Sequence, residues 1–408
     1  MKIAVISRSA NHGGAAIAAR RLAEALRQEG AEASLVTLQE IKDDGKPFPL
    51  FAKVREEIPF IEERIQILCN NRFSLKNLWK TDTGSFGLPI WENRTVKEAD
   101  AIILNWTNQG MLSLKGIGKL CNAGKKVIWT MHDMWPFTGI CHHAMECCRF
   151  KEECGCCPYL KSHDVNDLSH RIWKRKHTLY ENHPIIFVAV SNWLAGETRK
   201  SKLLCNKRVE VIPNPFKPVE IKKVLHKVKT GRILFAAAGL DNWIKGLDTF
   251  KQALHLLYNR GIPIEAVLMG ALKNPKSLEG FHPVPVRHLG TVTGEENIAG
   301  IYGECDVVVN CSSFENLPGT IIEGEAYGAV PVAFDRGGQR DIIDHLQTGY
   351  MAPWNDSTAR RAKSLADGIE WALNQGEDIL PRMRKNVENK FSYSSIARKY
   401  IDLIEEKC

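Results

Sequence analysis

Short apolar runs alternate with amphipathic segments from the start of the chain. Lys2–Ser7 predicts a buried strand, and the alanine-rich stretch Ala15–Glu29 has the apolar periodicity of a helix. Gly30 ends that helix, and Ala33–Leu38 predicts the next strand. A strand, loop, helix and strand in this order form a βαβ unit, the building block of parallel sheets. The beginning of the chain therefore indicates an α/β fold.

The same alternation continues along the chain with one interruption. Further strands are predicted in the first half at Ala101–Leu104, Lys126–Met131, Ile185–Val190 and Val209–Ile212. Pro213-Asn214-Pro215 then breaks regular structure. The second half predicts a helix at Gly246–Asn259 and strands at Arg232–Ala238, Ile264–Met269, Asp306–Asn310 and Val330–Phe334. We therefore predict two doubly wound, Rossmann-like α/β domains. Because ligands of such sheets bind beyond the carboxyl ends of the strands, we expect the domains to face each other across a cleft.

Composition narrows the class of protein. The chain has 408 residues, of which 44% are hydrophobic and 25% charged, so wholesale disorder and fibrous structure are excluded. No stretch approaches the roughly 20 apolar residues that a bilayer span needs. The N-terminus lacks the apolar run and cleavage site of a signal peptide. We expect a soluble, cytoplasmic protein.

The net positive charge of the chain comes entirely from its first half. The first 216 residues hold 31 Lys and Arg against 23 Asp and Glu, whereas the rest of the chain is balanced at 24 against 24. Arg171, Lys174, Arg175 and Lys176 form a local cluster. Two interpretations stay open: a solvated face, or a surface that meets phosphorylated lipid, membrane headgroups or nucleic acid.

Six of the twelve cysteines lie between Cys141 and Cys157. The spacing Cys141-x5-Cys147-x6-Cys154-x2-Cys157 suits a tetrahedral Zn²⁺ site of four thiolates, with Cys148 and Cys156 as substitutes. Unpaired thiols or a disulfide are the alternatives. We expect the metal to be structural and to stabilise the cysteine-rich insertion that contains these residues.

The segment Ser312–Glu323 carries the most informative chemistry. It follows a predicted strand, and Pro318 and Gly319 are suited to the start of a helix, whose amides and partial positive charge bind phosphate. Glu315 falls in the loop before that helix, and Glu323 falls inside it. A carboxylate accepts two hydrogen bonds side by side, which suits the vicinal diol of a sugar. Two surface glutamates are the alternative.

In this context Glu-x7-Glu resembles the donor-site motif of retaining, GT-B fold glycosyltransferases of family 4. The resemblance extends over nearly the whole chain. Its further motifs are Gly13-Gly14, His132-Asp133, Ser191-Asn192-Trp193, Ile212-Pro213-Asn214, Lys245-Gly246, Leu289-Gly290, Ala326-Tyr327-Gly328, Asp335-Arg336-Gly337-Gly338 and a closing segment, Phe391–Glu406. The cysteine-rich segment of this chain follows the run HDMWPFTG. It is similar to insertions that follow a run of this kind in one subgroup of the family.

The resemblance implies a role for individual residues. Glu323 would bind the ribose hydroxyls of a sugar nucleotide, and Glu315 would hold the transferred sugar. Lys245 would offset charge on the leaving diphosphate, and His132 would lie near the anomeric carbon. The donor site would also use Gly13, Gly14, Asn316, Leu317, Pro318, Gly319 and Thr320.

Simpler roles stay open at several of these positions. His132 could be a buried histidine satisfied by the backbone, Lys245 a solvated lysine, and Gly13-Gly14 a plain helix-entry turn. The sequence departs from the family at one position. The family usually has a cation five residues before the residue that corresponds to Lys245, whereas this chain has Leu240 there. A replacement for this cation could come from Arg232, Lys273 or Arg336.

We therefore expect residues 1–215 to form an acceptor-side domain with a cysteine-rich insertion at 139–160, 216–388 a nucleotide-sugar domain, and 389–408 a helix returning to the first. The implied activity is retaining transfer from a UDP- or GDP-sugar to a glycan or polyprenyl-linked saccharide in cell-surface polysaccharide synthesis. It needs no cofactor for chemistry and would take place in the cytoplasm, with contact at the inner membrane face as a hypothesis.

Two other classes of function remain. A nucleotide-sugar epimerase or a phosphorylase could share this fold. A zinc-dependent nucleic-acid-binding protein is a more remote alternative, because Glu146, Glu152 and Glu153 stand among the cysteines where positive charge would be needed. We expect no nucleic-acid partner.

Overall fold

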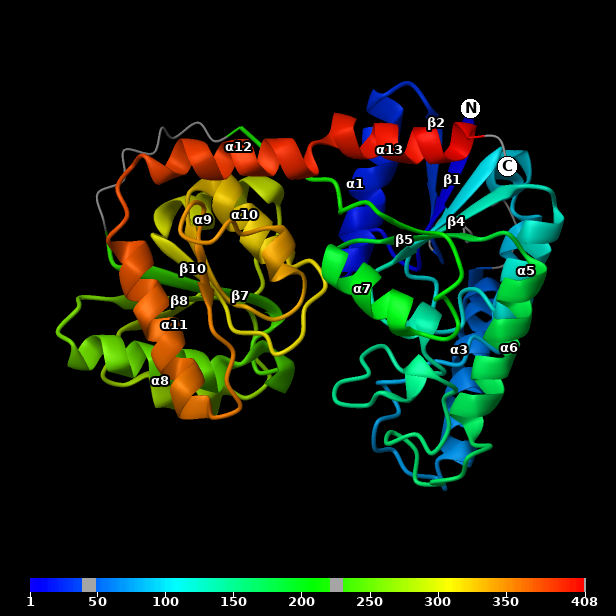
Figure 1. Ribbon diagram of the computed structural model, residues 1–408, viewed down its shortest axis with the longest axis horizontal. Helices are drawn as coiled ribbons and strands as arrows, with labels where there is room; N and C mark the ends of the chain where they lie inside the picture. The colour runs from blue at the N-terminus through cyan, green and yellow to red at the C-terminus, as the bar shows by residue number, and fades with distance from the viewer. Residues whose placement is uncertain (39–48, 221–229, 407–408) are drawn as a thin grey trace. The chain divides into compact units, whose positions relative to one another are not determined.

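The computed structural model describes residues 1–38, 49–220 and 230–406, with side chains from residue 57 onward in the second range (Figure 1). The chain divides into two compact units. Unit 1 consists of Met1–Pro215 together with the chain from Tyr393 onward, and unit 2 consists of Phe216–Ser392. The last helix therefore belongs to the unit that the chain builds first.

Unit 1 contains a six-stranded parallel sheet in the order β2-β1-β3-β4-β5-β6. Its strands are β1 (Lys2–Ile6), β2 (Glu32–Val36), β3 (Ala101–Leu104), β4 (Lys126–Met131), β5 (Ile186–Ala189) and β6 (Val209–Val211). The central strands are buried along their length, as expected of a sheet covered on both faces. The strand order reverses between β1 and β3, which makes that point the place where a ligand would bind.

Several helices of unit 1 begin at a residue whose side chain caps the helix. Ser113, Asp167 and Ser191 each accept a hydrogen bond from the backbone N–H three residues later, which satisfies an otherwise unpaired donor at the helix start. The helices are α1 (Gly14–Gln28), α3 (Pro49–Asn70), α4 (Arg94–Glu98), α5 (Leu114–Asn122), α6 (Leu168–Asn182), α7 (Asn192–Lys200) and α13 (Tyr393–Glu405).

Helix α13 packs against α1 (Figure 1). Ile396 and Tyr400 of α13 join Leu22 and Leu26 of α1 in one buried apolar cluster. The Tyr400 hydroxyl lies 2.8 Å from Thr130 Oγ1 on β4, so the helix is also tied to the sheet by a buried hydrogen bond. This apolar face explains why α13 folds with unit 1.

Unit 2 contains a second six-stranded parallel sheet, in the order β12-β11-β10-β7-β8-β9. The strands are β7 (Arg232–Gly239), β8 (Glu265–Ala271), β9 (Val286–His288), β10 (Val307–Asn310), β11 (Val330–Phe334) and β12 (Tyr350–Ala352). The chain moves outward from β7 to β9 and then returns to the other side of β7 with β10. The reversal between β7 and β10 is the topological switch point of this sheet.

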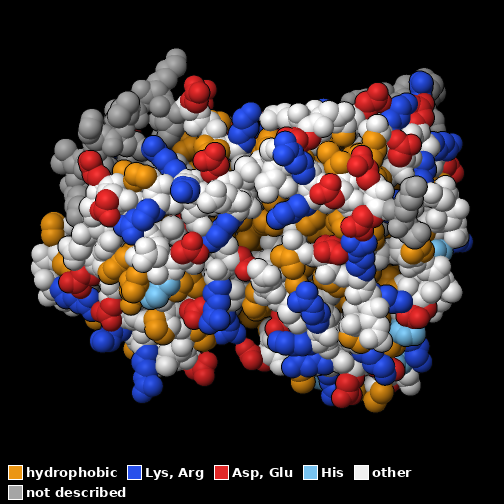
Figure 2. Space-filling view, turned by 45° about the horizontal axis from the view of Figure 1, so that its top comes forward, with side chains coloured by type: hydrophobic (Ala, Val, Ile, Leu, Met, Phe, Trp, Pro, Cys, Tyr) orange, Lys and Arg blue, Asp and Glu red, His pale blue; other side chains and the backbone are white. Residues whose placement is uncertain are grey.

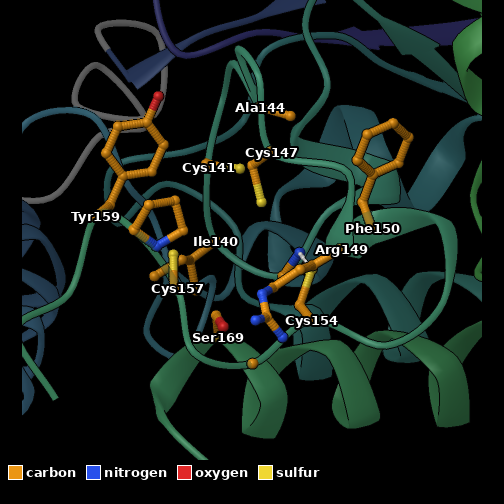
Figure 3. Close-up of a pocket in the computed structure, with 13 residues that line it drawn as sticks. Ile140, Cys141, Ala144, Cys147, Arg149, Phe150, Cys154, Cys157, Tyr159 and Ser169 are labelled. Atoms are coloured by element: carbon orange, nitrogen blue, oxygen red, sulfur yellow. Dashed lines mark hydrogen bonds between the residues drawn. The ribbon is translucent and has the colours of Figure 1, made fainter. Parts of the chain in front are cut away.

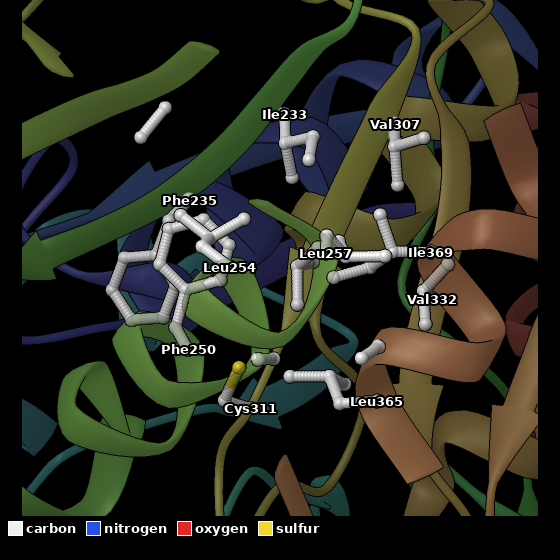
Figure 4. Close-up of a cluster of buried hydrophobic side chains, with 14 of the residues drawn as sticks. Ile233, Phe235, Phe250, Leu254, Leu257, Val307, Cys311, Val332, Leu365 and Ile369 are labelled. Carbon is white, nitrogen blue, oxygen red and sulfur yellow. The ribbon is translucent and has the colours of Figure 1, made fainter. Parts of the chain in front are cut away.

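Helices cover both faces of the second sheet. They are α8 (Leu247–Asn259), α9 (Glu295–Glu304), α10 (Gly319–Tyr327), α11 (Thr358–Leu373) and α12 (Ile379–Phe391). One core joins Phe250 and Leu254 of α8 to Leu365 and Ile369 of α11 across the strands (Figure 4). The other core includes side chains of α9, α10 and α12. The two doubly wound parallel sheets predicted from the sequence are confirmed.

In the described part of the chain, no helix combines the length and apolar character that would let it cross a membrane.

Candidate functional site

Two loops meet at the switch point of the second sheet. One follows β7 and ends in a short 3₁₀ helix, Trp243–Lys245, and the other follows β10. Ser313 N–H donates to the carbonyl of Ile244 at 2.9 Å, which joins the two loops. Gly246 has a φ of +75°, and a Cβ there would stand 2.4 Å from the carbonyl oxygen of Cys311. Only glycine permits this approach, which places Lys245 beside the loop after β10.

Lys245 and Glu315 form an ion pair in this place. Lys245 Nζ lies 2.5 Å from Glu315 Oε1, and the hydroxyl of Ser312 donates to the same oxygen at 2.8 Å. The side chains are 31% and 15% exposed, so the pair stands at an accessible surface. Two of the residues predicted to act on the donor are thus in direct contact.

The backbone of Glu315 is fixed from the neighbouring strand. Gly338, which follows β11, donates its N–H to the carbonyl of Glu315 at 3.1 Å. A Cβ on Gly337 would stand 2.3 Å from that same carbonyl, and Gly337 has a φ of +97°. The Gly-Gly pair after β11 therefore allows the close packing that positions Glu315.

Helix α10 begins four residues after Glu315. Pro318 is its N-cap residue, no side chain of the described residues caps its first turn, and Gly319 is exposed with none of their atoms within 4 Å of the place where a Cβ would be. Thr320 accepts a hydrogen bond from Asn310 at 3.5 Å, while Asn316 is buried and Leu317 half-buried beside this turn. A helix start of this kind attracts anions through its amides and its dipole.

Glu323 lies in the second turn of α10. The phenol of Tyr302, on α9, donates a hydrogen bond of 2.8 Å to Glu323 Oε2. Tyr302 is fully buried, and burial together with the neighbouring carboxylate raises its pKa well above the usual value. Sequence reasoning missed Tyr302, because no motif marks a residue that lies 21 positions before the glutamate it orients.

The position five residues before Lys245 is not available for a cation. Leu240 is fully buried in the core of unit 2. Arg232, one of the expected replacements, starts β7 and pairs with Glu265 at 3.1 Å, so it lies at the end of the sheet opposite to Lys245. The interpretation of Arg232 as a replacement is therefore wrong. Arg336 follows β11 and therefore lies at the same end of the sheet as Lys245. Its guanidinium is 4.2 Å from the centre of the Trp354 ring.

The remaining residues predicted for the site belong to unit 1. Gly13 caps the start of α1 with a φ of +94°, and a Cβ on Gly13 or Gly14 would meet no atom of the described residues within 4 Å. His132 follows β4 and lies 2.9 Å from Asn105 Oδ1 through its Nε2. Burial lowers the pKa of His132 to about 4, so its ring is neutral at physiological pH.

A buried charged network lies directly after His132. His142 Nδ1 donates to Asp133 Oδ2 at 2.7 Å, and His142 Nε2 donates to Asp82 Oδ2 at 2.7 Å. Although burial opposes charge, the two carboxylates raise the pKa of His142 to about 10. Trp106 Nε1 adds a 3.0 Å hydrogen bond to Asp133. The imidazolium therefore ties the segment after β4 to Asp82, and the hydrogen bond from Trp106 ties Asp133 to the loop after β3.

Sequence reasoning missed this network. Arg64 of α3 extends it, with hydrogen bonds to Asp82 and, at 3.1 Å, to Glu63. The one signal in the sequence is Asp133, an acidic residue within the mainly apolar run Met131–Ile140. A buried charge of this kind requires partners, but nothing in the sequence indicates which they are.

The four cysteines predicted as metal ligands line one pocket (Figure 3). Cys141, Cys154 and Cys157 are buried, and Cys147 is half-buried. Burial raises the pKa of Cys141 and Cys154 to about 12. Within residues 1–38, 49–220 and 230–406, no three or more His, Cys, Asp or Glu side chains stand close enough together to hold a metal ion. The structure therefore gives no support to the expected structural zinc.

Lys176 is not part of a basic surface cluster, so that interpretation is wrong. Its side chain is fully buried, with Nζ 3.5 Å from the centre of the Trp135 ring and hydrogen-bonded to the carbonyls of Trp135 and Thr138 at 2.5 and 3.0 Å. Burial lowers its pKa to about 7. Arg171, Lys174 and Arg175 are exposed on the same helix.

Two family models match this chain. Residues 12–219 match the one described as Glycosyltransferase Family 4, and residues 231–375 match the one described as Glycosyl transferases group 1. Among curated proteins, the amylovoran biosynthesis glycosyltransferase AmsK of Erwinia amylovora is 25% identical over 223 residues. That match covers 48% of this chain and 49% of AmsK, so it spans about half of the relative's length.

Solved structures show the same fold over the whole chain. HepE of Anabaena, in complex with UDP and glucose, aligns with a TM-score of 0.58 and 15% identity over 99% of both chains. Sucrose-phosphate synthase of Thermosynechococcus elongatus aligns with a TM-score of 0.63 and 17% identity over 99% of this chain and 98% of that one. The two parallel Rossmann-like sheets are thus those of GT-B glycosyltransferase structures.

Proposed function

Because this chain belongs to glycosyltransferase family 4, we propose that it transfers a sugar from a UDP- or GDP-sugar to a hydroxyl group of a glycan or polyprenyl-linked saccharide, with retention of anomeric configuration. The observation that carries the proposal is the contact between Lys245 and Glu315 at the switch point of the second sheet. The similar proteins support it, since AmsK is an amylovoran biosynthesis glycosyltransferase and the structure of HepE is a complex with UDP and glucose.

In this proposal the diphosphate binds at the start of α10. The amides around Gly319 and Thr320 and the ammonium of Lys245 face the negative charge that grows on the leaving diphosphate. Stabilisation of developing charge by fixed donors is usually the largest contribution to catalysis. Glu315, held by Ser312 and by the Gly337-Gly338 turn, would accept hydrogen bonds from the transferred sugar.

Glu323 would bind the ribose diol of the donor. Its carboxylate has two oxygens, and Tyr302 orients it through Oε2. On the acceptor side, His132 would act as a neutral hydrogen-bond partner near the anomeric carbon, since its lowered pKa removes its positive charge. Gly13 and Gly14 would let the backbone approach a ligand, which the open space around both residues supports.

We further propose that Cys141, Cys147, Cys154 and Cys157 hold a structural Zn²⁺ and that the reaction itself uses no cofactor. The basis for this proposal is the donor type and the spacing of the cysteines in the sequence, because thiolates are preferred zinc ligands. Since the pocket forms within the segment that follows His132 and Asp133, the metal would stabilise that segment. It would take no part in sugar transfer.

The proposed activity is tested in two steps. Thermal unfolding is measured with UDP, GDP, ADP and CMP, because a ligand that binds the native state raises stability, by about 2.7 kcal/mol at a hundred times its Kd. The sugar nucleotide of the stabilising base is then incubated with candidate acceptors, and NMR identifies the anomer formed. We expect stabilisation by one nucleoside diphosphate and a product of retained configuration. The absence of any nucleotide effect would overturn the proposal, and a sugar product formed without acceptor would indicate an epimerase.

A further inference from the structure

Exposed apolar side chains concentrate in one short stretch of unit 1. Twelve large hydrophobic side chains are exposed in the described part of the chain, and six of them lie between Ile58 and Trp79. Phe73, Leu75 and Trp79 are 73%, 71% and 64% exposed, values far above those of ordinary apolar residues in a folded protein. Such a group of exposed apolar residues marks an interaction surface.

The segment Arg72–Lys80 is held by hydrogen bonds although three of its apolar side chains are exposed. Asn71 donates to the carbonyls of Ser74 and Lys76 at 2.9 and 3.0 Å, and its Oδ1 accepts from the N–H of Lys161 at 2.8 Å. Arg64 donates to the carbonyl of Leu78, which is buried, at 2.6 Å. The exposure of Phe73, Leu75 and Trp79 is therefore built into an ordered loop.

Basic residues alternate with these apolar ones. Arg72, Lys76 and Lys80 are exposed, and the segment contains no acidic residue. Helix α6 adds further positive charge next to it, because Arg171 Nη2 donates to Asn70 at 2.5 Å and Arg175 Nη1 donates to Ser85 at 3.0 Å. Figure 2 shows Lys and Arg side chains close to apolar ones at the end of unit 1 that lies at the bottom of the view.

We propose that Arg72–Lys80, together with Arg171, Lys174 and Arg175, docks unit 1 onto a bilayer that contains anionic lipid. The basic side chains match the negative headgroups, and Phe73, Leu75 and Trp79 have the amphipathic or apolar character that enters the headgroup region. Nucleic acid would match the charge but would leave the aliphatic Leu75 in water. The proposal deepens the proposed function, because a polyprenyl-linked acceptor would lie in that same membrane.

The test uses the full chain and vesicles of phosphatidylcholine, with or without about 30% phosphatidylglycerol. Binding is measured by flotation for three versions of the chain: wild type, Phe73→Ser/Leu75→Ser/Trp79→Ser, and Arg72→Glu/Lys76→Glu. Two controls are matched in chemistry and lie in unit 2. Tyr258→Ser/Leu346→Ser removes exposed apolar residues, and Arg384→Glu/Lys385→Glu reverses exposed charges on α12.

We expect wild type and both controls to bind the anionic vesicles and to be released by salt, and both test variants to bind roughly tenfold or more weakly. Equal binding of the test variants, or no binding of the wild type, would overturn the proposal. Capture of RNA but not of vesicles by the wild type would overturn the assignment to lipid. Stabilisation by the donor nucleotide is measured on every variant. Its absence in all of them would refute the proposed function and leave the vesicle result standing on its own.

Discussion

Tyr302 donates a hydrogen bond of 2.8 Å from its phenol to Glu323 Oε2, so a fully buried ring on α9 orients a carboxylate on α10. Because burial and the neighbouring carboxylate raise the pKa of Tyr302 well above its usual value, the phenol keeps its proton and remains a donor at physiological pH. One oxygen of Glu323 is thereby committed to the protein. This arrangement fixes the orientation of the Glu323 carboxylate.

Tyr302→Phe tests that relationship. The loss of this hydrogen bond to a charged acceptor lowers the stability of the folded chain by roughly 1.5 kcal/mol or slightly more, and it leaves the carboxylate of Glu323 free to turn away from its binding orientation. We therefore expect the affinity for the stabilising nucleoside diphosphate to fall about tenfold, as measured by calorimetry. Tyr258→Phe, on exposed α8, is the control and should leave affinity unchanged. An unchanged affinity of Tyr302→Phe would show that the orientation of Glu323 does not matter for the nucleotide.

Lys245→Ala and Glu315→Gln test the ion pair. Each should lower kcat/KM by about a hundredfold to a thousandfold, because each removes a charge that faces the reacting groups. The double variant should lose less than the product of the two effects, since the partners act as a unit. Lys363→Ala, at an exposed pair with Asp367, is the control. Full activity of either variant, in a chain that still folds, would refute the proposed site.

His142→Phe tests the buried network after His132. The change leaves the carboxylates of Asp82 and Asp133 without their shared cation in a buried place, which should cost about 3–5 kcal/mol of unfolding free energy. Chemical denaturation measures this difference. His177→Ala, at an exposed position on α6, should cost far less. Equal stability of the two variants would mean that the network contributes little.

Glu325 gives a pH dependence of known sign. Burial raises its pKa to about 8, and its carboxyl contacts Thr348 and Asn386 at 2.6 Å. The folded state therefore keeps a proton that the unfolded state releases near the ordinary value of 4.5, so this group's contribution to stability falls as the pH rises from about 4.5 to 8.

Glu325→Gln should remove that contribution. We expect the stability of the variant, relative to wild type, to increase steadily between about pH 5 and pH 8, as measured by denaturation at each pH. Glu388→Gln, at an exposed position on α12, should show a constant difference. A constant difference for Glu325→Gln would show that the carboxyl group is ionised in the folded chain.

The proposed zinc site is tested by metal analysis of protein purified without chelators. We expect about one zinc ion per chain, and a loss of that metal with a lower Tm in Cys141→Ser and Cys157→Ser. Cys205→Ser removes an exposed cysteine outside the pocket and should retain both metal and Tm. A metal-free wild type with a Tm that a chelator does not change would refute the site.

Sequence patterns predicted the fold closely because its strands are local apolar runs. The strand predicted at Lys126–Met131 coincides with β4, and the one at Val330–Phe334 coincides with β11. The contact of Lys245 with Glu315 could be expected only through a family resemblance, because 70 residues separate them. Parallel topology, not local pattern, brings the ends of β7 and β10 together.

Residues that depend on distant partners could not be predicted. Asp82 and His142 are 60 positions apart, and neither stands in a motif that names the other. Lys176, by contrast, could have been recognised as buried. It lies on the same helical face as Ile172 and Tyr180, both of which are buried, so the periodicity of α6 already placed it toward the interior. Because Lys176 directly follows Lys174 and Arg175, the local composition indicated a basic surface and hid the helical periodicity.

Helix α13 has a consequence for how the chain is made. Its apolar face covers α1, yet it is synthesised only after all of unit 2. During translation the apolar surface around Leu22 and Leu26 therefore stays uncovered until α13 has left the ribosome. Residues 216–392 form a continuous segment, so unit 2 can be complete before the helix that covers α1 is made.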